Sequence, residues 1–461
     1  MFWIFTVLLV NNAYATMRVS CIGGGTTLGI NLSYPLKEAY PAQLQKLLGS
    51  NYNVQNYGVQ GATMLKKGDN SYWKTDAYQE ALLSKPNLVF IDLGSCDAKF
   101  TNRAHLNEFI KDYHDFIQSF LQLPTHPKVV LLLPLTSFQT DSNEINDKVI
   151  TDFIIPKLRE VAYNDHLRLI DLHSLSVNRK DLMPDKIYPN ADGAALIAKR
   201  LYDVVVQQQD VNFDIMKRLN IQCKQTDFYG YNCAEFTFDN RDCQVVQPKH
   251  AAKGRPWVWR ARFWGHEPQT DIALLERGFH VVYCDVAELL GNDEAIHYWN
   301  DFYKILTNAG LGKKAVLEGM SRGAIYMYNW AAVNPHKVSC TYADNALLDL
   351  KYWPDTAILI KDFNLTTANQ IGLLKASPID KVTQIVKGGF PMLHLSADDD
   401  EALDPSKNTL LFEQKVKQLG GSITVIHKPG FKHHPHSLPN PTPIVDFILK
   451  ATGYTIPYPG N

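Results

Sequence analysis

The sequence has almost no net charge. Its 46 lysines and arginines are balanced by 47 aspartates and glutamates over 461 residues, which leaves a formal net charge of -1. A chain so balanced offers no general attraction to a polyanion, and nucleic acid is therefore not expected as a partner. The seven cysteines form no C-x-x-C pair, which argues against a structural zinc site. Hydrophobic residues make up 45% and charged residues 20%, a composition typical of a globular protein.

The apolar run at residues 2–10 is too short to span a bilayer, and it precedes the A-x-A pattern Ala13-Tyr14-Ala15. This combination predicts a signal peptide over residues 1–15 and a periplasmic or secreted protein, with no membrane insertion after cleavage. No lysine or arginine precedes the apolar run, so an artefactual start site and a short membrane anchor stay open as alternatives.

All seven cysteines follow the proposed cleavage site, so at least one of them is free. Cys223, Cys233 and Cys243 are spaced closely enough for a disulfide between adjacent strands. Isolated buried thiols are the alternative.

The chain is too long for one ordinary core, which predicts two α/β domains, each of roughly 200 to 250 residues. Between residues 17 and 208, short apolar runs alternate with amphipathic segments. We expect parallel strands at 18–22, 88–93, 129–133 and 167–172, with helices at 39–48, 106–121 and 151–163. This alternation predicts a doubly wound sheet, whose ligands bind beyond the carboxyl ends of the strands.

Four short segments in this half carry a family resemblance. They are 22–29 (IGGGTTLG), 56–63 (NYGVQGAT), 93–97 (LGSCD) and 185–190 (DKIYPN). In this order they resemble the four sequence blocks of SGNH (GDSL-type) hydrolases. The resemblance implies that residues 17–208 form a flavodoxin-like, three-layer domain.

The same resemblance implies that this domain has lost its chemistry. The nucleophile of the family aligns with Gly25, its asparagine with Cys96 and its histidine with Tyr188, and only Gly61 and Asp185 match. Glycine has no nucleophilic atom, and tyrosine, with a reference pKa of about 10, is a poor general base at neutral pH. We expect a non-catalytic domain that either keeps a sugar-sized cleft or only braces the second domain.

Residues 209–461 form the second predicted domain. Alternating aromatic and β-branched residues at 231–238 and 243–247, around the turn Asp239-Asn240, predict antiparallel strands. Residues 256–263 continue as a strand that carries two arginines. Later strands are expected at 279–285, 314–318, 338–343, 391–396 and 422–428, alternating with helices.

The motif Gly319-Met320-Ser321-Arg322-Gly323 has the G-x-S-x-G form. An apolar run at 315–317 enters it, and residues 324–332 leave it as a predicted buried helix. In such a strand-turn-helix context the serine hydroxyl stands on a strained turn, and the two glycines leave room for the turn and for close packing. Ser321 is therefore the predicted nucleophile.

The order of these elements resembles the α/β-hydrolase fold, with Ser321 after the central strand. The resemblance implies an acid and then a histidine, each after a later strand. Asp400 aligns best with the acid, and the family's G-x-x-H spacing from Gly430 selects His433, with His436 as the reserve candidate for the base. The implied mechanism is attack of Ser321 on an ester carbonyl, with His433 as base and Asp400 orienting the imidazole.

The resemblance also places the oxyanion hole. One donor is the backbone N–H of Arg322, and the other is expected near Trp264. Trp264, Trp299 and Trp353 could each stack on a sugar, although such residues more often belong to the core.

Residues 260–267 are predicted to govern specificity. An unpaired buried guanidinium is costly, so Arg260 is expected in a structural ion pair and Arg262 at the substrate. His266 and His436 are further candidates for substrate binding, and Arg322 could direct its guanidinium to a carboxylate or a hydroxyl-rich ligand.

The histidines at 433, 434 and 436 raise the question of a metal. The sequence offers no paired carboxylate or cysteine motif to complete such a site, so neither a metal nor a cofactor is expected.

The combined architecture resembles esterases that polysaccharide-degrading bacteria export. The resemblance implies removal of methyl or acetyl esters from cell-wall carbohydrate, and the arginines favour methyl-esterified pectin. A prolyl-oligopeptidase-like serine peptidase is one alternative, although the sequence has no propeller-like repeat and no double-glutamate segment. A glycan-binding protein that uses the degenerate cleft at Gly25 and Gly61 is the other.

Overall fold

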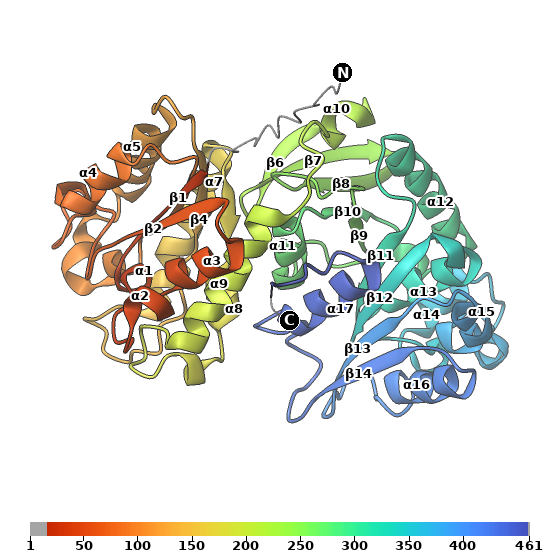
Figure 1. Ribbon diagram of the computed structural model, residues 1–461. Coiled ribbons are helices and arrows are strands. Elements are labelled where there is room, and N and C mark those ends of the chain that lie inside the picture. Colours follow the sequence, from red (N-terminus) through yellow and green to blue (C-terminus); the bar gives the residue numbers. More distant parts are fainter. Residues whose placement is uncertain (1–15, 460–461) are drawn as a thin grey trace, which may run out of the picture. The chain divides into compact units, whose positions relative to one another are not determined.

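A computed structural model describes residues 16–459 (Figure 1). The predicted signal peptide lies outside the described residues. Within them, none of the helices combines the length and the apolar character needed to cross a bilayer. The chain folds into two compact units, of which the first contains the chain up to Lys157, Arg179–Val205 and the end from Tyr458. The second contains Leu158–Asn178 and Val206–Pro457.

The first sheet has the strand order β2-β1-β3-β4-β5. Its strands are β1 (Met17–Gly23), β2 (Tyr52–Gly58), β3 (Leu88–Asp92), β4 (Lys128–Leu132) and β5 (Arg168–Ile170). β1 lies between β2 and β3 and is parallel to both, with Val19 opposite Val54 and Leu88. This is the flavodoxin-like order of a doubly wound sheet.

Helices connect these strands. They are α1 (Gly25–Leu28), α2 (Pro35–Glu38), α3 (Tyr40–Leu48), α4 (Asp76–Leu83), α5 (Phe109–Leu121), α6 (Asp147–Val149), α7 (Ile155–Asn164), α8 (Leu172–Ser176) and α9 (Ala191–Val206). The amphipathic segments predicted α3, α5 and α7, because their apolar faces pack on the sheet, but α9, the longest of these helices, was not predicted. The phenylalanines of α5, for example, are fully buried.

Two details of the predicted first sheet are wrong. β2 was not expected as a strand, because its mostly half-exposed residues include Asn and Gln and form no apolar run. The strand predicted at 167–172 stops at Ile170, because Asp171 caps α8, where its carboxylate accepts a hydrogen bond from the N–H of Ser174 at 2.8 Å.

The second sheet has nine strands in the order β14-β13-β12-β11-β9-β10-β8-β7-β6. They are β6 (Lys224–Phe228), β7 (Tyr231–Phe238), β8 (Arg241–Gln247), β9 (Trp257–Arg260), β10 (His280–Cys284), β11 (Ala315–Met320), β12 (Val338–Asp344), β13 (Met392–Ala397) and β14 (Ile423–Lys428). β6, β7 and β8 are joined antiparallel, and β8 is antiparallel to β10. From β10 to β14 the neighbours are parallel.

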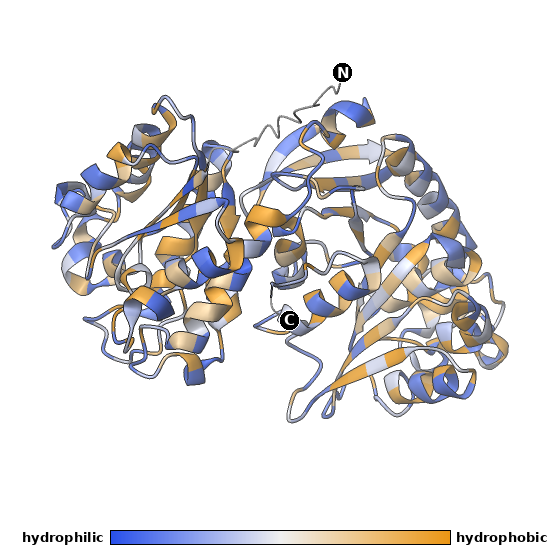
Figure 2. Ribbon diagram, in the orientation of Figure 1, coloured by the Kyte–Doolittle hydropathy of each residue, from blue (hydrophilic) through white to orange (hydrophobic). Residues whose placement is uncertain are grey.

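The helices of the second unit include α10 (Ile215–Leu219), α11 (Gln269–Glu276), α12 (Asp293–Asn308), α13 (Gly323–Val333), α14 (Thr356–Asp362), α15 (Val382–Lys387), α16 (Thr409–Gln418) and α17 (Thr442–Thr452). Figure 2 shows the strongly hydrophobic residues gathered on strands and on inward helix faces. All but the last residue of α13 are buried, as expected for a helix that follows a nucleophile turn.

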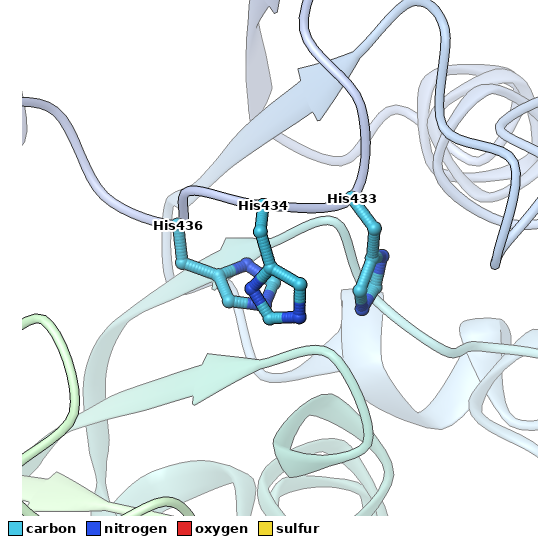
Figure 3. A group of neighbouring side chains, drawn as sticks. All are labelled: His433, His434 and His436. Atoms are coloured by element: carbon cyan, nitrogen blue, oxygen red, sulfur yellow. The ribbon is translucent and has the colours of Figure 1, made fainter.

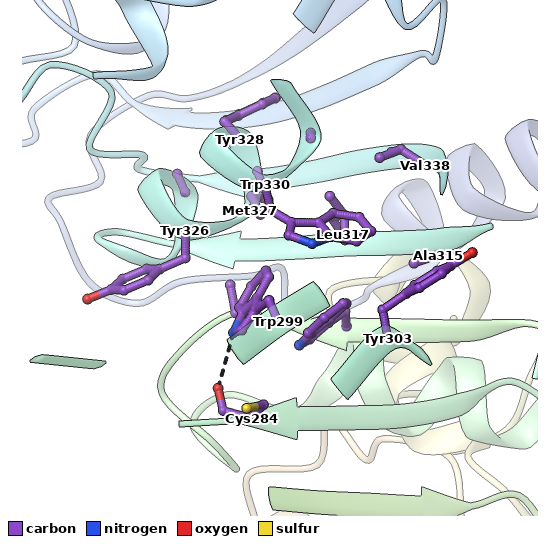
Figure 4. Close-up of a cluster of buried hydrophobic side chains, with 14 of the residues drawn as sticks. Cys284, Trp299, Tyr303, Ala315, Leu317, Tyr326, Met327, Tyr328, Trp330 and Val338 are labelled. Carbon is purple, nitrogen blue, oxygen red and sulfur yellow. Dashed lines mark hydrogen bonds between the residues drawn. The ribbon is translucent and has the colours of Figure 1, made fainter. Parts of the chain in front are cut away.

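An aromatic core supports this helix (Figure 4). Trp259 of β9 stacks on Trp299 of α12, with ring centroids 4.2 Å apart, and Trp330 of α13 packs beside both. The indole N–H of Trp299 donates to the carbonyl of Cys284. Trp299 is thus a core residue and not a stacking platform for a sugar.

All seven cysteines are free, and six of them are buried. The alternative of buried thiols is the one observed. The predicted fold class, two α/β domains with a flavodoxin-like first sheet and an α/β-hydrolase second sheet, is confirmed.

Candidate active site

Ser321 stands on the turn between β11 and α13. Its backbone has φ = +48°, a left-handed conformation that is unusual for a residue with a side chain, and its N–H donates to the carbonyl of Asp344 at 2.8 Å. A Cβ on Gly319 would lie 2.8 Å from the backbone nitrogen of Ala324, so this glycine is required for the helix to approach the strand. A Cβ on Gly323 would only reach ordinary contact, so the prediction that both glycines make room is wrong for Gly323.

The structure brings Ser321, His433 and Asp400 together. Nε2 of His433 lies 3.0 Å from Oγ of Ser321, and Nδ1 lies 2.8 Å from Oδ2 of Asp400. Asp400 follows β13 and His433 follows β14, so both side chains come from the carboxyl edge of the sheet. This arrangement can transfer a proton from the serine hydroxyl to an imidazole that the carboxylate orients.

The carboxylate of Asp400 is held on its other side by two backbone N–H groups. Its Oδ1 accepts from Ala402 at 2.9 Å and from Leu403 at 2.8 Å. Burial raises the pKa of Asp400, but the hydrogen bonds from His433 and from these two amides outweigh it, and the resulting pKa is lower than usual. The carboxylate is therefore ionised at neutral pH.

His436, the reserve candidate for the base, has a different acid. Its Nδ1 lies 3.4 Å from Oδ1 of Asp344, and the same oxygen accepts from the ammonium of Lys428 at 2.9 Å. Figure 3 shows the three histidines on the segment after β14, and their ring centroids lie 4.8 to 5.0 Å from one another. Sequence reasoning missed Asp344, although its position as the last residue of β12 could have suggested it.

A pocket of about 760 Å³ opens beside the serine. It is lined by Phe263, Trp264, His266, Ser321, Arg322, Trp353, Pro354, Ala402, Leu403, His433, His434 and His436. Of the residues predicted to contact a substrate, Trp264, His266, Arg322, Trp353 and His436 are in this lining, whereas Arg262 is not. Phe263, Pro354 and Leu403 are apolar members that carry no motif and were not predicted.

The two predicted oxyanion positions are at the pocket. Arg322 precedes the first residue of α13, and its backbone N–H donates no hydrogen bond within the described chain. Trp264 lies between Phe263 and Gly265, which both have positive φ, and its ring packs on Phe228 with centroids 4.9 Å apart. Its N–H is also without a described acceptor, so both amides are available to a ligand.

Arg260 and Arg262 have different environments. Arg260 is fully buried, and its guanidinium pairs with Asp271 at 2.5 Å and Glu318 at 3.3 Å, as expected for a structural residue. Burial raises the pKa of Glu318 well above its usual value, and the charge of Asp271 adds to this. Arg262 was predicted within a strand but lies two residues beyond the end of β9, because the chain turns at Phe263.

Three groups of described side chains could hold a metal ion, and two of them include histidines of the segment 433–436; the third is Asp239, His297 and Asp301. The ligand atoms of His433, His434 and His436 lie within 4.8 Å of one another, as do those of His266, Glu267 and His434. Glu267 supplies a carboxylate that the sequence argument had not brought to these histidines. Burial and the neighbouring histidines lower the pKa of His434, which favours the neutral imidazole that a metal requires.

The corresponding positions of the first unit offer no nucleophile beside a base. The ring of Tyr188 fills the space beside Gly25, where a Cβ would lie 2.5 Å from its Cε1. Burial raises the pKa of the Cys96 thiol to about 12. The hydroxyl of Thr27 is buried and donates to Asp92 at 3.2 Å, and the carboxylate of Asp185 accepts the N–H groups of the turn that follows it.

Comparison with known proteins gives likenesses over parts of the chain. "Acetylxylan esterase" from Xylanibacter ruminicola is 40% identical over 201 residues, which are 40% of this chain and 42% of that protein. The chain thus spans less than half the length of this relative.

Two solved structures are similar at low identity. An S-formylglutathione hydrolase from Agrobacterium tumefaciens is 13% identical, with 50% of this chain and 96% of that chain covered and a TM-score of 0.39. A carbohydrate acetylesterase family member from Sinorhizobium meliloti is 18% identical, with 41% and 97% covered and a TM-score of 0.33.

The first half of the chain matches a family model. The matched residues are 20–201, and the family is described as GDSL-like Lipase/Acylhydrolase. This range contains all four segments in which the sequence resembles SGNH hydrolases. Residues 20–201 are therefore a GDSL-like lipase/acylhydrolase domain.

Proposed function

We propose that this protein is a serine carboxylic-ester hydrolase that removes methyl or acetyl groups from a carbohydrate. The observation that carries the proposal is the hydrogen-bonded series from Asp400 through His433 to Ser321, which ends in a pocket of about 760 Å³. The active site then belongs to the domain of residues 209–461, and the domain of residues 17–208 is non-catalytic.

The chemistry follows from the three side chains. Oγ of Ser321 forms a bond to the ester carbonyl carbon while its proton moves to Nε2 of His433, and Asp400 stabilises the imidazolium. The N–H groups of Arg322 and Trp264 would hold the oxyanion, each contributing about 100- to 1000-fold in rate. The imidazolium protonates the leaving alcohol, and water then releases the acyl group and returns the proton to the serine. No cofactor is needed.

Two observations support a carbohydrate as the substrate. The first domain belongs to an acylhydrolase family, and the relative that is 40% identical is described as an acetylxylan esterase. In addition, Trp264 and Trp353 line the pocket, where their rings could stack on a sugar. Export through a signal peptide over residues 1–15 would bring the enzyme to such polymers in the periplasm or outside the cell.

The test uses the full chain and the variants Ser321→Ala and Thr26→Ala. We expect Ser321→Ala to lower turnover of a chromogenic acetate ester by at least about 10⁴-fold with an unchanged circular dichroism spectrum. Thr26→Ala should retain activity. Release of acetate from acetylated xylan and of methanol from methyl-esterified pectin, measured beside cleavage of a proline peptide, separates an esterase from a peptidase. Activity that persists in Ser321→Ala, or that is lost in Thr26→Ala, contradicts the proposal.

A further inference from the structure

Arg262 and Arg322 are two cationic side chains that have no carboxylate partner within residues 16–459. Among the described residues, neither of them takes part in an ion pair or a side-chain hydrogen bond, and Nε of Arg262 is buried with its hydrogen-bonding capacity unused. Both guanidinium groups lie near the same ring, with their Cζ atoms 5.0 and 5.8 Å from the centroid of Phe263. Arg322 also lies 5.1 Å from the ring centroid of Trp353.

Arg260 shows that the fold can supply carboxylate partners to an arginine of this segment. It belongs to the same segment of chain, and the fold supplies it with the carboxylates of Asp271 and Glu318. A buried or half-buried guanidinium is costly without such a partner. For the buried Arg260 the fold therefore provides counter-charges, whereas among the described residues no carboxylate pairs with Arg262 or Arg322.

The two charges also act on each other. Burial, followed by the positive charge of Arg262, lowers the pKa of Arg322, although a guanidinium stays protonated at neutral pH. Two neighbouring cations of this kind repel each other, and an anion placed between or beside them relieves the repulsion. The arrangement is thus unfavourable when empty and favourable when an anion is bound.

The position of the pair connects it with the proposed reaction. Arg322 directly follows Ser321 and lines the same pocket as Phe263 and Trp353. Arg262 is not a lining residue of this pocket, but its guanidinium lies 5.0 Å from the ring centroid of Phe263, which is one. An anion held there would lie beside the ester that Ser321 attacks. The guanidinium is planar and donates two parallel hydrogen bonds, a geometry that matches a carboxylate.

We infer that Arg262 and Arg322 form an anion subsite that binds a free carboxylate of an acidic carbohydrate, next to the ester bond that is cleaved. The inference rests on the proposed function and narrows its substrate class to esters of uronate-containing carbohydrates, in preference to neutral glycans. The ester is cleaved as described above, and the subsite takes part by binding the neighbouring sugar acid.

A matched pair of substrates tests the subsite. The first is trigalacturonate with one methyl ester, and the second is the same trisaccharide ester with its two free carboxyl groups reduced to primary alcohols. We expect the full-length enzyme to prefer the charged ester by at least about tenfold in kcat/KM. Arg262→Gln should remove most of this preference, mainly by raising KM, and Arg262→Lys should restore only part of it because ammonium lacks the planar fork.

Arg218→Gln is the charge-matched control, since Arg218 is exposed on α10 and its guanidinium lies over the ring of Phe213. It should keep the full preference. For Arg322→Gln, only the ratio of kcat/KM between the charged and the reduced ester is compared, because the backbone of Arg322 belongs to the proposed oxyanion hole. A third trisaccharide ester, with sulfate groups in place of the free carboxylates, tests whether the subsite prefers carboxylate or sulfate. A higher kcat/KM on the sulfated ester than on the carboxylate ester overturns the carboxylate assignment.

Calorimetric binding of unesterified trigalacturonate distinguishes the failure of this inference from that of the proposed function. Binding by the wild type that Arg262→Gln weakens at least about tenfold supports the subsite even if no ester is cleaved. Equal rates on the charged and neutral esters overturn the subsite, while ester cleavage that depends on Ser321 still stands. A preference that persists after both Arg262→Gln and Arg322→Gln also overturns it.

Discussion

His436 is paired with Asp344, at 3.4 Å between Nδ1 and Oδ1, and so it has a different acid from His433, which is paired with Asp400 at 2.8 Å. Two histidines three positions apart are thus held by carboxylates from two different strand ends. Only His433 makes a described hydrogen bond to Ser321.

This separation predicts unequal effects of two matched substitutions. His433→Gln should lower kcat on a chromogenic acetate ester by at least about 10³-fold, because the serine loses its proton acceptor. His436→Gln should cost far less in kcat, because its ring is occupied with Asp344. A larger loss in His436→Gln than in His433→Gln would show that His436 is the base.

Asp400→Asn should retain the fold and lower kcat by about 10⁴-fold, because an amide no longer holds the imidazole in the tautomer that accepts the serine proton. Asp398→Asn is the matched control, since Asp398 is exposed and pairs with His427. Steady-state kinetics on one ester substrate compares the two variants. Equal losses in both would contradict the assignment of Asp400.

The two glycines around Ser321 should respond differently to an added methyl group. In Gly319→Ala the methyl would lie 2.8 Å from backbone atoms of α13, and the second unit should lose about 1 to 3 kcal/mol of stability. Gly323→Ala places the methyl at 3.6 Å from Arg262 at the start of a helix, so it should be neutral or stabilising by up to about 1 kcal/mol. Urea midpoints of the two variants measure the difference, and equal shifts would count against the close approach at Gly319.

The stability of the first unit should depend on pH through Asp92. Burial raises the pKa of this carboxyl to about 6, with a smaller opposing effect from the hydrogen bond of Thr27. An unfolded aspartate titrates near pH 4, so between about pH 4 and 6 the unfolded state loses its proton first. The contribution of Asp92 to the free energy of unfolding therefore falls by about 3 kcal/mol over this window and is constant above it.

Asp92→Asn stays neutral and removes this dependence. Relative to the wild type, its free energy of unfolding should rise between pH 4 and pH 6 and level off above pH 6. Urea titrations at several pH values, read by hydrogen exchange of peptides from β3, measure this difference. A difference that does not change with pH would contradict the raised pKa.

Chelation should leave the esterase activity unchanged. Both ring nitrogens of His433 are engaged, one with Asp400 and one with Ser321, so the proposed relay has no place for a metal. Added Zn²⁺ should inhibit, because the neighbouring imidazoles could draw His433 from the serine. In His434→Gln, Zn²⁺ should inhibit less, when the rate with Zn²⁺ is divided by the rate of the same variant without metal. Loss of esterase activity in EDTA would contradict the proposed relay.

The sequence predicted the strands that are buried on both faces but missed two of the edge strands, although the edge strand β14 was predicted. β3 and β11 are continuous buried runs, whereas β2 and β6 lie at sheet edges, and their half-exposed polar residues form no hydrophobic pattern. Burial on both faces produces an apolar run that a single sequence displays, and an edge strand lacks it.

The candidate site shows the same division. Ser321, Asp400 and His433 were found because the strained turn and the order of strand ends dictate where such residues occur along the chain. Asp344 and Glu267 were missed, since each is a single acidic residue without a motif and meets its histidine only through the topology of the sheet. The lack of partners at Arg262 also required the structure, because counter-charges come from distant segments.

The ring of Tyr188 beside Gly25 would make the proposed loss of chemistry in the first domain difficult to reverse. A serine restored at position 25 would collide with the tyrosine, and a histidine restored at position 188 would face a glycine with no hydroxyl to activate. Each single reversion is therefore harmful or without benefit, so the effect of a change at one position depends on the residue at the other, which is epistasis in evolutionary terms. Under the proposed function, the first domain would be free to diverge as a non-catalytic scaffold. A single substitution at position 25 or at position 188 would not restore hydrolytic activity to it.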